Sequence, residues 1–463
     1  MLRPHCPQLN KCSVPMSKFI VDIFHFKFFC CIIYKGKKKV RINMKETFKL
    51  FGIDEKTIAL YEKCEQKLKT KFEEIDNIAM YNTAKVLKAF RDNRISETHF
   101  NHTTGYGYDD CGREAIEKVY ASVFNAEDAL VRIQFVNGTH ALSTALFACL
   151  MPGDTMLSIT GQPYDTLCET IGIVENPVSL KAYGVSYMQV DLVDNEFNIE
   201  AIKEVLTNNK IKMIFIGRSR GYSSRLSLTI SKIANAIEEI RSLDKDVIIM
   251  LDNCYGEFVE KLEPTEVGAD IIAGSLIKNL GGGICETGGY IVGRHDLVES
   301  AARHLTAPGI GKECGASLGK NRQILQGMFL APNVVASSIK ASILAAAMLE
   351  ELGYDVSPKA FDERTDIIQA ITFNNKEKLI KFIQGIQAAS PVDSFVLPEP
   401  WAMPGYTDEV IMAAGTFISG ASIELSADAP VRAPYIAFMQ GGLTYPSAAL
   451  AICKAISNMQ DLG

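Results

Sequence analysis

"DVIIMLDNCYGEFVEKLEPTEVGADIIAGSLIK" is the stretch from residue 246 to residue 278. It contains two apolar, branched runs, and each leads to an ionisable residue, Asp252 after the first and Lys278 after the second. Such runs are typical of strands buried on both faces of a parallel sheet. In open α/β sheets ligands bind at the carboxyl ends of the strands. The stretch therefore predicts a parallel sheet with two ionisable groups at its binding edge.

Similar apolar runs recur along the middle of the chain and alternate with helix-length segments. The runs are ALVRIQFV, TMLSIT, SYMQVDL and KMIFIG before the quoted stretch, and GGYIVG after it. This alternation predicts an α/β domain with a mostly parallel sheet. After Arg294 a long alanine-rich helical segment and strands joined by Pro/Gly turns predict a smaller C-terminal α+β domain. We expect a helical segment at 44–97, a large domain at 98–320 and a small domain at 321–463.

Residues 1–43 differ from the rest because they are aromatic and basic. Their apolar run is broken by Asp22, His25 and Lys27, whereas a membrane-spanning helix needs about 20 apolar residues. Two interpretations remain, a membrane anchor and a leader that precedes the real start at Met44. We favour the second, and we leave these residues out of the fold prediction.

Composition excludes several classes of protein. Of the 463 residues 47% are hydrophobic and 22% charged, as in a globular protein, and the net charge of -6 offers no nucleic-acid surface. The 12 cysteines are scattered without C-x-x-C pairs, which favours a reducing cytoplasm over a disulfide framework. His99 and His102 lack nearby metal-ligand partners, so we predict no metal site. We expect a cytoplasmic protein that binds neither nucleic acid nor membrane.

Three features at predicted strand ends have both a structural and a functional interpretation. Gly138 and Thr139 follow a strand and begin a helix, where free N–H groups bind phosphate, although Thr139 could simply cap the helix. Asp252 is either a turn residue or a carboxylate held for a partner. Lys278 either reaches solvent or is an amine whose pKa burial lowers. Together they match the needs of pyridoxal phosphate, namely a phosphate cradle, a carboxylate for the ring nitrogen and a lysine for the aldehyde.

The chain resembles the methionine γ-lyase/cystathionine β-lyase-like family, often called aluminium resistance proteins, among the fold-type-I pyridoxal-phosphate enzymes. The segments that carry this resemblance include HTTGYGYDDCGRE, FVNGTHAL, LDNCYGEFVE and GSLIKNLGGGICETGGYIVG, and they cover nearly everything from residue 44 onward. The resemblance implies the aspartate-aminotransferase fold and a homodimer or homotetramer with shared active sites. It also implies a carbon–sulfur lyase for cystathionine, methionine or cysteine, in which Lys278 forms the Schiff base and abstracts the α-proton before β- or γ-elimination.

The resemblance assigns further residues to the cofactor. Gly138, Thr139 and His140 occupy the phosphate-loop position, and Ser275 stands where related enzymes use a hydroxyl against the phosphate. Ile277 stands at the next hydroxyl position, so one phosphate contact is missing. Tyr164, with Thr166 nearby, matches the aromatic residue that stacks on the cofactor ring, and its structural alternative is a packed core tyrosine.

The resemblance also points to residues of a neighbouring subunit and of the substrate site. Tyr106 or Tyr108 would reach the partner subunit's cofactor, but Asp110 stands where related lyases have an arginine. The missing charge would then come from Arg113, Arg218 or Arg220. For the substrate α-carboxylate, Arg432 matches the expected arginine and Arg220 is the rival.

Two other functions remain open at this point. One keeps the cofactor and changes the reaction to transamination or other α-carbon chemistry. The other is a low-turnover cofactor-binding protein with a metal-tolerance role, although a retained Lys278 favours catalysis.

Overall fold

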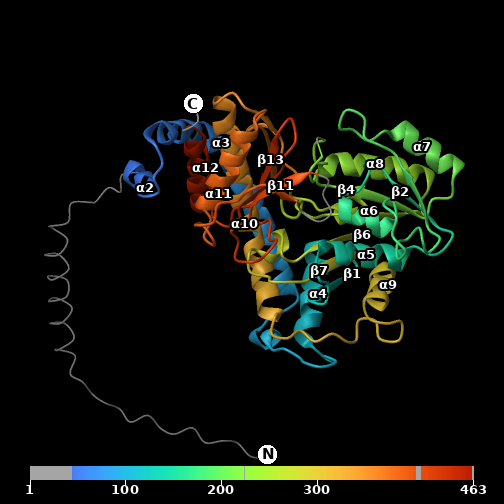
Figure 1. Ribbon diagram of the computed structural model, residues 1–463. Helices are drawn as coiled ribbons and strands as arrows, with labels where there is room; N and C mark the ends of the chain where they lie inside the picture. The colour runs from blue at the N-terminus through green and yellow to red at the C-terminus, as the bar shows by residue number, and fades with distance from the viewer. Residues whose placement is uncertain (1–43, 224, 403–407, 461–463) are drawn as a thin grey trace, which may run out of the picture. The chain divides into compact units, whose positions relative to one another are not determined.

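The computed structural model describes residues 44–223, 225–402 and 408–460 (Figure 1). The expectations for residues 1–43 lie outside the described residues. The chain divides between Leu50 and Phe51 into two units. The first is described only through helix α2 (Met44–Leu50), and everything below concerns the second.

The large sheet has seven strands, which match the seven apolar runs of the sequence. Their order is β1-β7-β6-β5-β4-β2-β3, and β3, β2, β4, β5 and β6 pair in parallel while β7 pairs antiparallel with β6 and β1. The predicted, mostly parallel α/β sheet is therefore confirmed. The strands are β1 (Asp128–Arg132), β2 (Thr155–Ser158), β3 (Ser186–Gln189), β4 (Met213–Gly217), β5 (Ile248–Asp252), β6 (Ile271–Ser275) and β7 (Gly289–Gly293).

Helices cover both faces of this sheet. In Figure 1 the strands lie between α8 (Ile230–Leu243), above, and α5 (Gly138–Cys149) with α9 (His295–Leu305), below. One hydrophobic cluster joins α5 and α9 to the sheet through fully buried residues such as Leu146, Phe215 and Met250. Apolar side chains on both faces of the strands explain why the runs lack the polar alternation of a half-exposed sheet. The remaining helices of this region are α4 (Cys111–Val123), α6 (Asp165–Ile171) and α7 (Ile199–Asn208).

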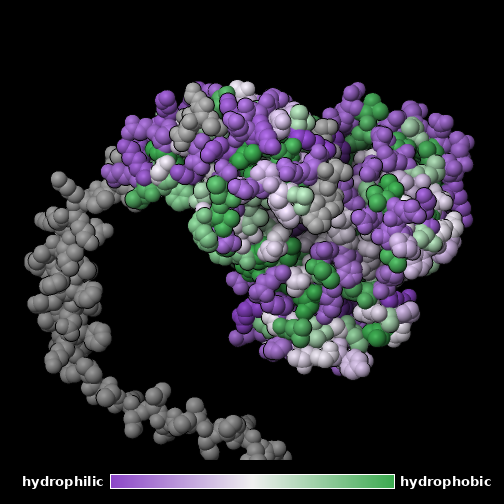
Figure 2. Space-filling model, viewed as in Figure 1, coloured by the Kyte–Doolittle hydropathy of each residue, from purple (hydrophilic) through white to green (hydrophobic). Residues whose placement is uncertain are grey.

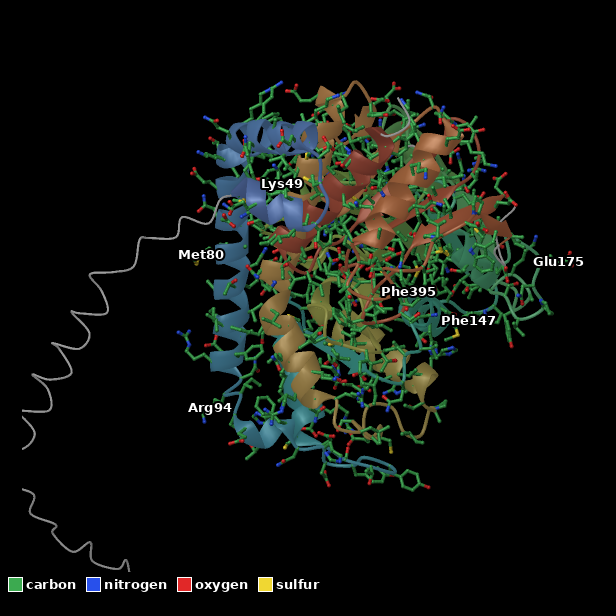
Figure 3. The ribbon with its side chains drawn as sticks, turned by 60° about the vertical axis from the view of Figure 1, so that its left-hand side comes forward. Lys49, Met80, Arg94, Phe147, Glu175 and Phe395 are labelled. Carbon is green, nitrogen blue, oxygen red and sulfur yellow. The ribbon has the colours of Figure 1, made fainter. Side chains whose placement is uncertain are left out.

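Two long helices, α3 (Glu55–Asp92) and α10 (Asn321–Glu351), run alongside each other in Figure 3, where Met80 lies on α3 and Arg94 follows its end. The sequence predicted the alanine-rich end of α10 but not its first fifteen residues. Pro332 lies inside the helix, and a proline in a helical pattern normally argues for a boundary. Among the described helices α10 alone is long and apolar enough to cross a membrane, but 72% of that apolar window is buried inside the protein.

The C-terminal part contains a six-stranded antiparallel sheet of order β10-β11-β12-β13-β9-β8. Helices α10, α11 (Lys376–Ala388) and α12 (Tyr445–Gln460) pack together, and both α10 and α11 contact its strands. The expected C-terminal α+β region is thus present, while the predicted domain boundaries stay a prediction. The strands are β8 (Asp355–Ser357), β9 (Ile368–Thr372), β10 (Trp401–Ala402), β11 (Glu409–Ala413), β12 (Ser426–Pro430) and β13 (Ile436–Gln440).

The glycine cluster after Lys278 touches helix α10 through backbone. A Cβ added at Gly282 would lie 2.4 Å from the carbonyl oxygen of Gly327, and one added at Gly327 would lie 2.5 Å from that of Gly281. Only glycine on both sides permits this approach, and Gly282 also has a φ of 55°. The turn that carries Lys278 is therefore fixed directly to the long helix.

On the face shown in Figure 2, hydrophilic and hydrophobic residues are interspersed over the described surface. Exposed apolar side chains include Phe395, which is labelled in Figure 3 and is 86% exposed. Singly exposed apolar residues are normal on protein surfaces.

Candidate active site

The carboxyl ends of β4, β5 and β6 lie together at one edge of the large sheet. Asp252, the last residue of β5, pairs with Gly217 on one side and with Ala273 on the other. Lys278 follows β6 and precedes the short helix η3 (Asn279–Gly281). The edge predicted from the sequence therefore brings Asp252 and Lys278 into one region, where each contributes to the pKa of the other.

The Lys278 ammonium lies over an aromatic ring, with Nζ 4.1 Å from the ring centre of Tyr255. Burial lowers the pKa of Lys278, but the nearby acidic groups, Cys254, Tyr255 and Asp252 among them, outweigh burial and raise it well above its usual value. The expectation of a lowered pKa is therefore wrong for the protein alone. That expectation considered only burial of Lys278 against an apolar wall. It left out the Asp252 carboxylate and the face of the Tyr255 ring, which both favour the charged form of the lysine.

Asp252 is the carboxylate of this region. Its Oδ1 accepts a hydrogen bond of 3.0 Å from the Cys254 N–H, and it is half-buried. Burial raises the pKa of Asp252, and the positive charge of Lys278 opposes that rise. The sequence left open whether Asp252 is a turn residue or a carboxylate held for a charged partner. It is both, because it accepts from the Cys254 N–H and interacts with the charge of Lys278.

Helix α5 begins at Gly138, and its N-cap is Asn137 rather than Thr139. The Asn137 side chain accepts a 2.8 Å hydrogen bond from the His140 N–H, so the amides of Gly138 and Thr139 are left without an acceptor within their helix. A Cβ added at Gly138 would lie 3.2 Å from Cβ of Ser275 and 3.5 Å from Sγ of Cys254. The helix N-terminus thus meets the ends of β5 and β6 at a point that a larger side chain would fill.

Thr139 also contacts the predicted aromatic residue. The Tyr164 hydroxyl donates a 3.0 Å hydrogen bond to Oγ1 of Thr139, and Thr166 Oγ1 lies 3.3 Å from the same oxygen. Burial raises the pKa of Tyr164, with a further contribution from Asp252. Tyr164 is 38% exposed, which differs from the packed core tyrosine that was its alternative.

His140 and Ser275 have local partners. The Val136 N–H donates to Nδ1 of His140 at 3.1 Å, and burial lowers the pKa of that ring. Ser275 is buried, and its Oγ accepts a 3.3 Å hydrogen bond from the Ile277 N–H. Ile277 itself approaches Gly420 of the C-terminal part, since a Cβ at Gly420 would lie 3.8 Å from its Cδ1. The missing hydroxyl is replaced by an apolar contact between the two parts.

The loop at 101–110 exposes its tyrosines and buries Asp110. Tyr106 and Tyr108 are 72% and 57% exposed, and their rings stack with centres 5.7 Å apart. Asp110 caps α4 by accepting from the Arg113 N–H at 2.9 Å and also accepts from Thr103 and Ser317. Although burial opposes it, these hydrogen bonds hold the pKa of Asp110 below its usual value. Asp110 is therefore a structural cap of α4.

The arginines expected to bind the cofactor phosphate or the substrate carboxylate are all bonded to other groups of the protein. Arg113 donates to the carbonyl oxygens of Gly107, Gly315 and Glu313, and Arg218 is fully buried between Asn253 and Glu260. Arg220 donates to both oxygens of Ser357 at 3.0 Å. Arg432 is exposed in the turn after β12 and forms a 2.9 Å ion pair with Asp408.

Three residues of this region escaped the sequence analysis. Tyr255 supports Lys278 from a left-handed backbone conformation, with φ 73°. The Arg225 guanidinium donates to the carbonyl oxygens of Gly217 and Ser219, and its charge acts on Asp252. Glu257 is fully buried, although the exposed Lys261 and Leu262 follow it four and five residues later.

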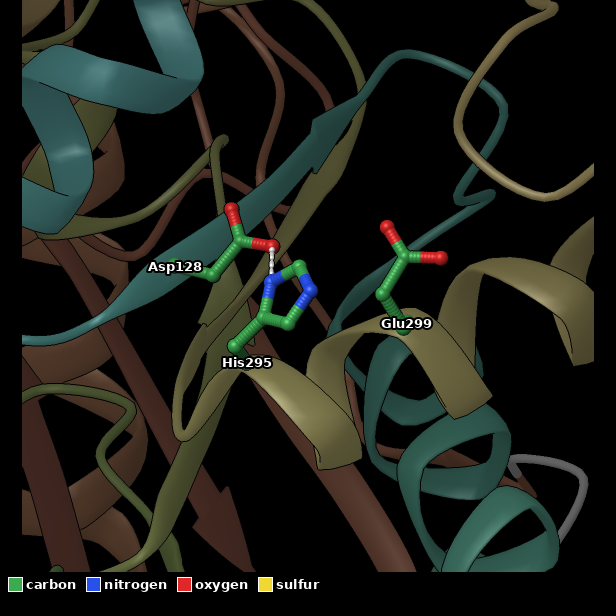
Figure 4. A group of neighbouring side chains, drawn as sticks. All are labelled: Asp128, His295 and Glu299. Atoms are coloured by element: carbon green, nitrogen blue, oxygen red, sulfur yellow. Dashed lines mark hydrogen bonds and ion pairs between the residues drawn. The ribbon is translucent and has the colours of Figure 1, made fainter.

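One further group of polar side chains has atoms close enough for a metal ion among the described residues. It consists of Asp128, His295 and Glu299, whose ligand atoms lie within 4.8 Å of one another (Figure 4). Asp128 already pairs with Lys312 at 2.5 Å and with His295 at 2.9 Å. It begins β1, opposite Gly293 and hence at the Ile271 end of β6, away from Lys278. Lys312 therefore supplies the positive charge at this position.

Comparison with known proteins agrees with this geometry. Residues 57–460 match the family model described as "Methionine gamma-lyase". The chain belongs to the methionine gamma-lyase family. The resemblance inferred from the sequence is thereby confirmed.

Relatives within this family are close. The uncharacterized protein YnbB of Bacillus subtilis (strain 168) is 50% identical over 391 residues, which are 84% of this chain and 93% of that protein. A solved structure from Clostridium novyi NT, described as a carbon-sulfur lyase involved in aluminum resistance, is 50% identical with a TM-score of 0.86 and covers 91% of this chain and 99% of its own.

The fold extends to more distant proteins. The pyridoxal-5'-phosphate dependent protein YhfS from Escherichia coli is 17% identical, with a TM-score of 0.56, and covers 82% of this chain and 96% of its own. The fold-type-I prediction is confirmed by such neighbours. The residues present in this methionine gamma-lyase family chain fit that cofactor, because a Cβ-free cradle at Gly138, a carboxylate at Asp252 and an amine at Lys278 lie at one edge.

Proposed function

We propose that the protein is a pyridoxal-phosphate-dependent carbon–sulfur lyase that acts on a sulfur-containing amino acid of the cystathionine, methionine or cysteine type. The observation that carries the proposal is the meeting of Lys278, Asp252 and the α5 N-terminus at the carboxyl edge of the sheet. Relatives described as carbon–sulfur lyases support the reaction class. When bound, pyridoxal phosphate would supply a sink for the electrons of a broken bond at the substrate α-carbon.

Each residue has a proposed role in that reaction. The amides of Gly138 and Thr139 would bind the phosphate, with the Ser275 hydroxyl beside them. Asp252 would hold a proton at the ring nitrogen, and Tyr164 would stack on the ring. Lys278 would attach the cofactor and then take the α-proton at Nζ. In β-elimination the carbon–sulfur bond then breaks, sulfur leaves with its electron pair and takes a proton as a thiol, and water releases the remainder as a 2-oxo acid and ammonium.

We also propose how the protein assembles and where in the cell it is located. The exposed Tyr106 and Tyr108 would reach the site of a partner subunit in a homodimer or homotetramer. The eight described cysteines are all free, which supports a cytoplasmic location. We propose no role for nucleic acid or membrane.

The test of this function uses the purified protein with and without Lys278. Wild type supplied with pyridoxal phosphate should show the visible absorbance of a lysine-linked cofactor, and Lys278→Ala should not. Wild type should also release thiol and 2-oxo acid from cystathionine, methionine or cysteine without an added keto acid. A colourless wild type would refute the cofactor role. A requirement for a keto acid without thiol release would instead indicate an aminotransferase, and coloured protein without turnover would indicate a cofactor-binding protein.

A further inference from the structure

Asp428 lies on the face of the C-terminal sheet that is directed towards Lys278. It is in the middle of β12, directly opposite Phe438 of β13, so both side chains are on the same face. Phe438 clusters with Ile368 and Ala370, and Tyr255 packs against that cluster. Because the Tyr255 ring supports the Lys278 ammonium, Asp428 is separated from the lysine by two aromatic neighbours.

The Asp428 carboxylate has hydrogen bonds on one oxygen only. Its Oδ2 accepts from the Tyr222 hydroxyl and from Gln440 Nε2, both at 3.2 Å. Its Oδ1 is buried and has no hydrogen-bond partner among the described residues, and the side chain is 5% exposed. No described lysine or arginine forms an ion pair with it, and its neighbour on β11 is Met412.

Hydrogen bonding alone does not explain a carboxylate here, because both donors bind one of its oxygens and the other is left without a partner. A buried carboxylate without a cation is costly, because removal from water is not offset by an opposite charge. Burial indeed raises the pKa of Asp428 to about 6, against the hydrogen bond from Tyr222. At neutral pH the group is still mostly ionised, so it presents an uncompensated negative charge.

Tyr222 is the more exposed of the two hydrogen-bond donors to this carboxylate. Its ring centre is 5.1 Å from that of Phe438, its hydroxyl binds Asp428, and it is 37% exposed. A rotation of this partly exposed ring would release Oδ2, beside the unpartnered Oδ1, to a ligand that carries its own hydrogen-bond donors.

We propose that Asp428 binds a positively charged group on the part of the substrate that leaves with sulfur. The substrates are then S-substituted amino acids whose thiol end carries an amine. This inference rests on the proposed function, because it assigns the α-carbon end of the substrate to Lys278. The further inference is that Asp428 of the C-terminal sheet determines which sulfur-bearing leaving groups the enzyme accepts.

The test compares two ligands of the same length that differ in one charge, S-(2-aminoethyl)-L-cysteine and S-propyl-L-cysteine. Binding is measured by calorimetry to Lys278→Ala protein supplied with pyridoxal phosphate, so that the readout does not depend on turnover. We expect the cationic ligand to bind at least about 10-fold more tightly, as for a hydrogen bond between charged groups. Adding Asp428→Asn should bring the two affinities close together.

Two control variants separate this role from a structural one. Asp355→Asn removes an exposed carboxylate of the same sheet and should keep the preference for the cation. Tyr222→Phe removes a hydrogen-bond donor but leaves the Asp428 carboxylate in place. This variant should therefore also retain the preference for the cationic ligand. Equal affinities in the Lys278→Ala protein, or a preference that survives Asp428→Asn, would overturn the inference. Thiol release by wild type is scored separately, so a cation preference without turnover refutes the lyase function and not the subsite.

Discussion

Glu257 offers a sharp test of the electrostatics beside Lys278. It is fully buried, its Oε1 accepts a 2.7 Å hydrogen bond from the Tyr290 hydroxyl, and its Oε2 has no partner among the described residues. Burial raises the pKa of Glu257 to about 8 from 4.5, while the Tyr290 hydroxyl opposes the rise. The side chain is therefore predicted to hold a proton at neutral pH in the folded protein and to lose it on unfolding.

The perturbation is Glu257→Gln, which keeps the shape of a protonated glutamate and cannot ionise. Because the folded pKa is raised, the stabilisation from protonated Glu257 is complete below pH 4.5 and is lost as the pH rises through about 8. The difference between these two pKa values corresponds to roughly 5 kcal/mol. Wild type should thus lose stability relative to the variant by about 4 kcal/mol between pH 5 and pH 8.

The assay is urea unfolding followed by circular dichroism at four pH values from 5 to 8 on both proteins. Tyr290→Phe removes the hydrogen bond that opposes the rise in the pKa of Glu257. The loss of stability of this variant with increasing pH should therefore extend to a higher pH than in wild type. The matched control is Glu239→Gln, a partly exposed glutamate paired with Lys203, whose effect should stay within about 1 kcal/mol at every pH. Curves for wild type and Glu257→Gln that run parallel, or that diverge towards acid pH, would refute the reasoning.

Three further predictions concern positions away from Glu257. Gly138→Val places side-chain atoms against Ser275 and should weaken pyridoxal phosphate binding about 10-fold in an absorbance titration, while circular dichroism stays unchanged. Asp110→Ala removes a helix cap and the acceptor of two buried hydroxyls, and should cost about 2–4 kcal/mol in urea unfolding; a loss below 0.5 kcal/mol, about the least that a lost cap costs, would contradict the capping role. Arg432→Ala breaks an exposed ion pair and should change the free energy of unfolding by less than about 1 kcal/mol.

Much of the fold could be predicted because most strands of the large sheet, β4 to β7 above all, are apolar on both faces. Such runs are readable without knowledge of their neighbours, and all seven were found. The beginning of α10 was missed because Pro332 is tolerated inside a helix that many tertiary contacts support. Strands β8 and β9 were also missed, and β8 has only three residues, too few to show a pattern.

The candidate site was predictable only where chemistry and strand ends coincide. Asp252 and Lys278 follow readable strands, and Gly138 begins a readable helix. The raised pKa of Lys278 was not predictable, since it depends on Tyr255 and Asp252 meeting it in space. Asp428 lies in a short strand whose sequence, SADAP, gives no sign of which face is buried.

The backbone contact between Gly282 and Gly327 has a consequence for dynamics. At this contact the turn that carries Lys278 meets the backbone of α10 directly, with no side chain between Gly282 and Gly327. Its amide hydrogens should therefore exchange with solvent only when that long helix opens as a unit. Lys278 is then tied to the opening of α10, whereas Tyr222 is 37% exposed and its side chain can rearrange without that helix. Ligand entry and cofactor retention would in this way be governed by two separate timescales.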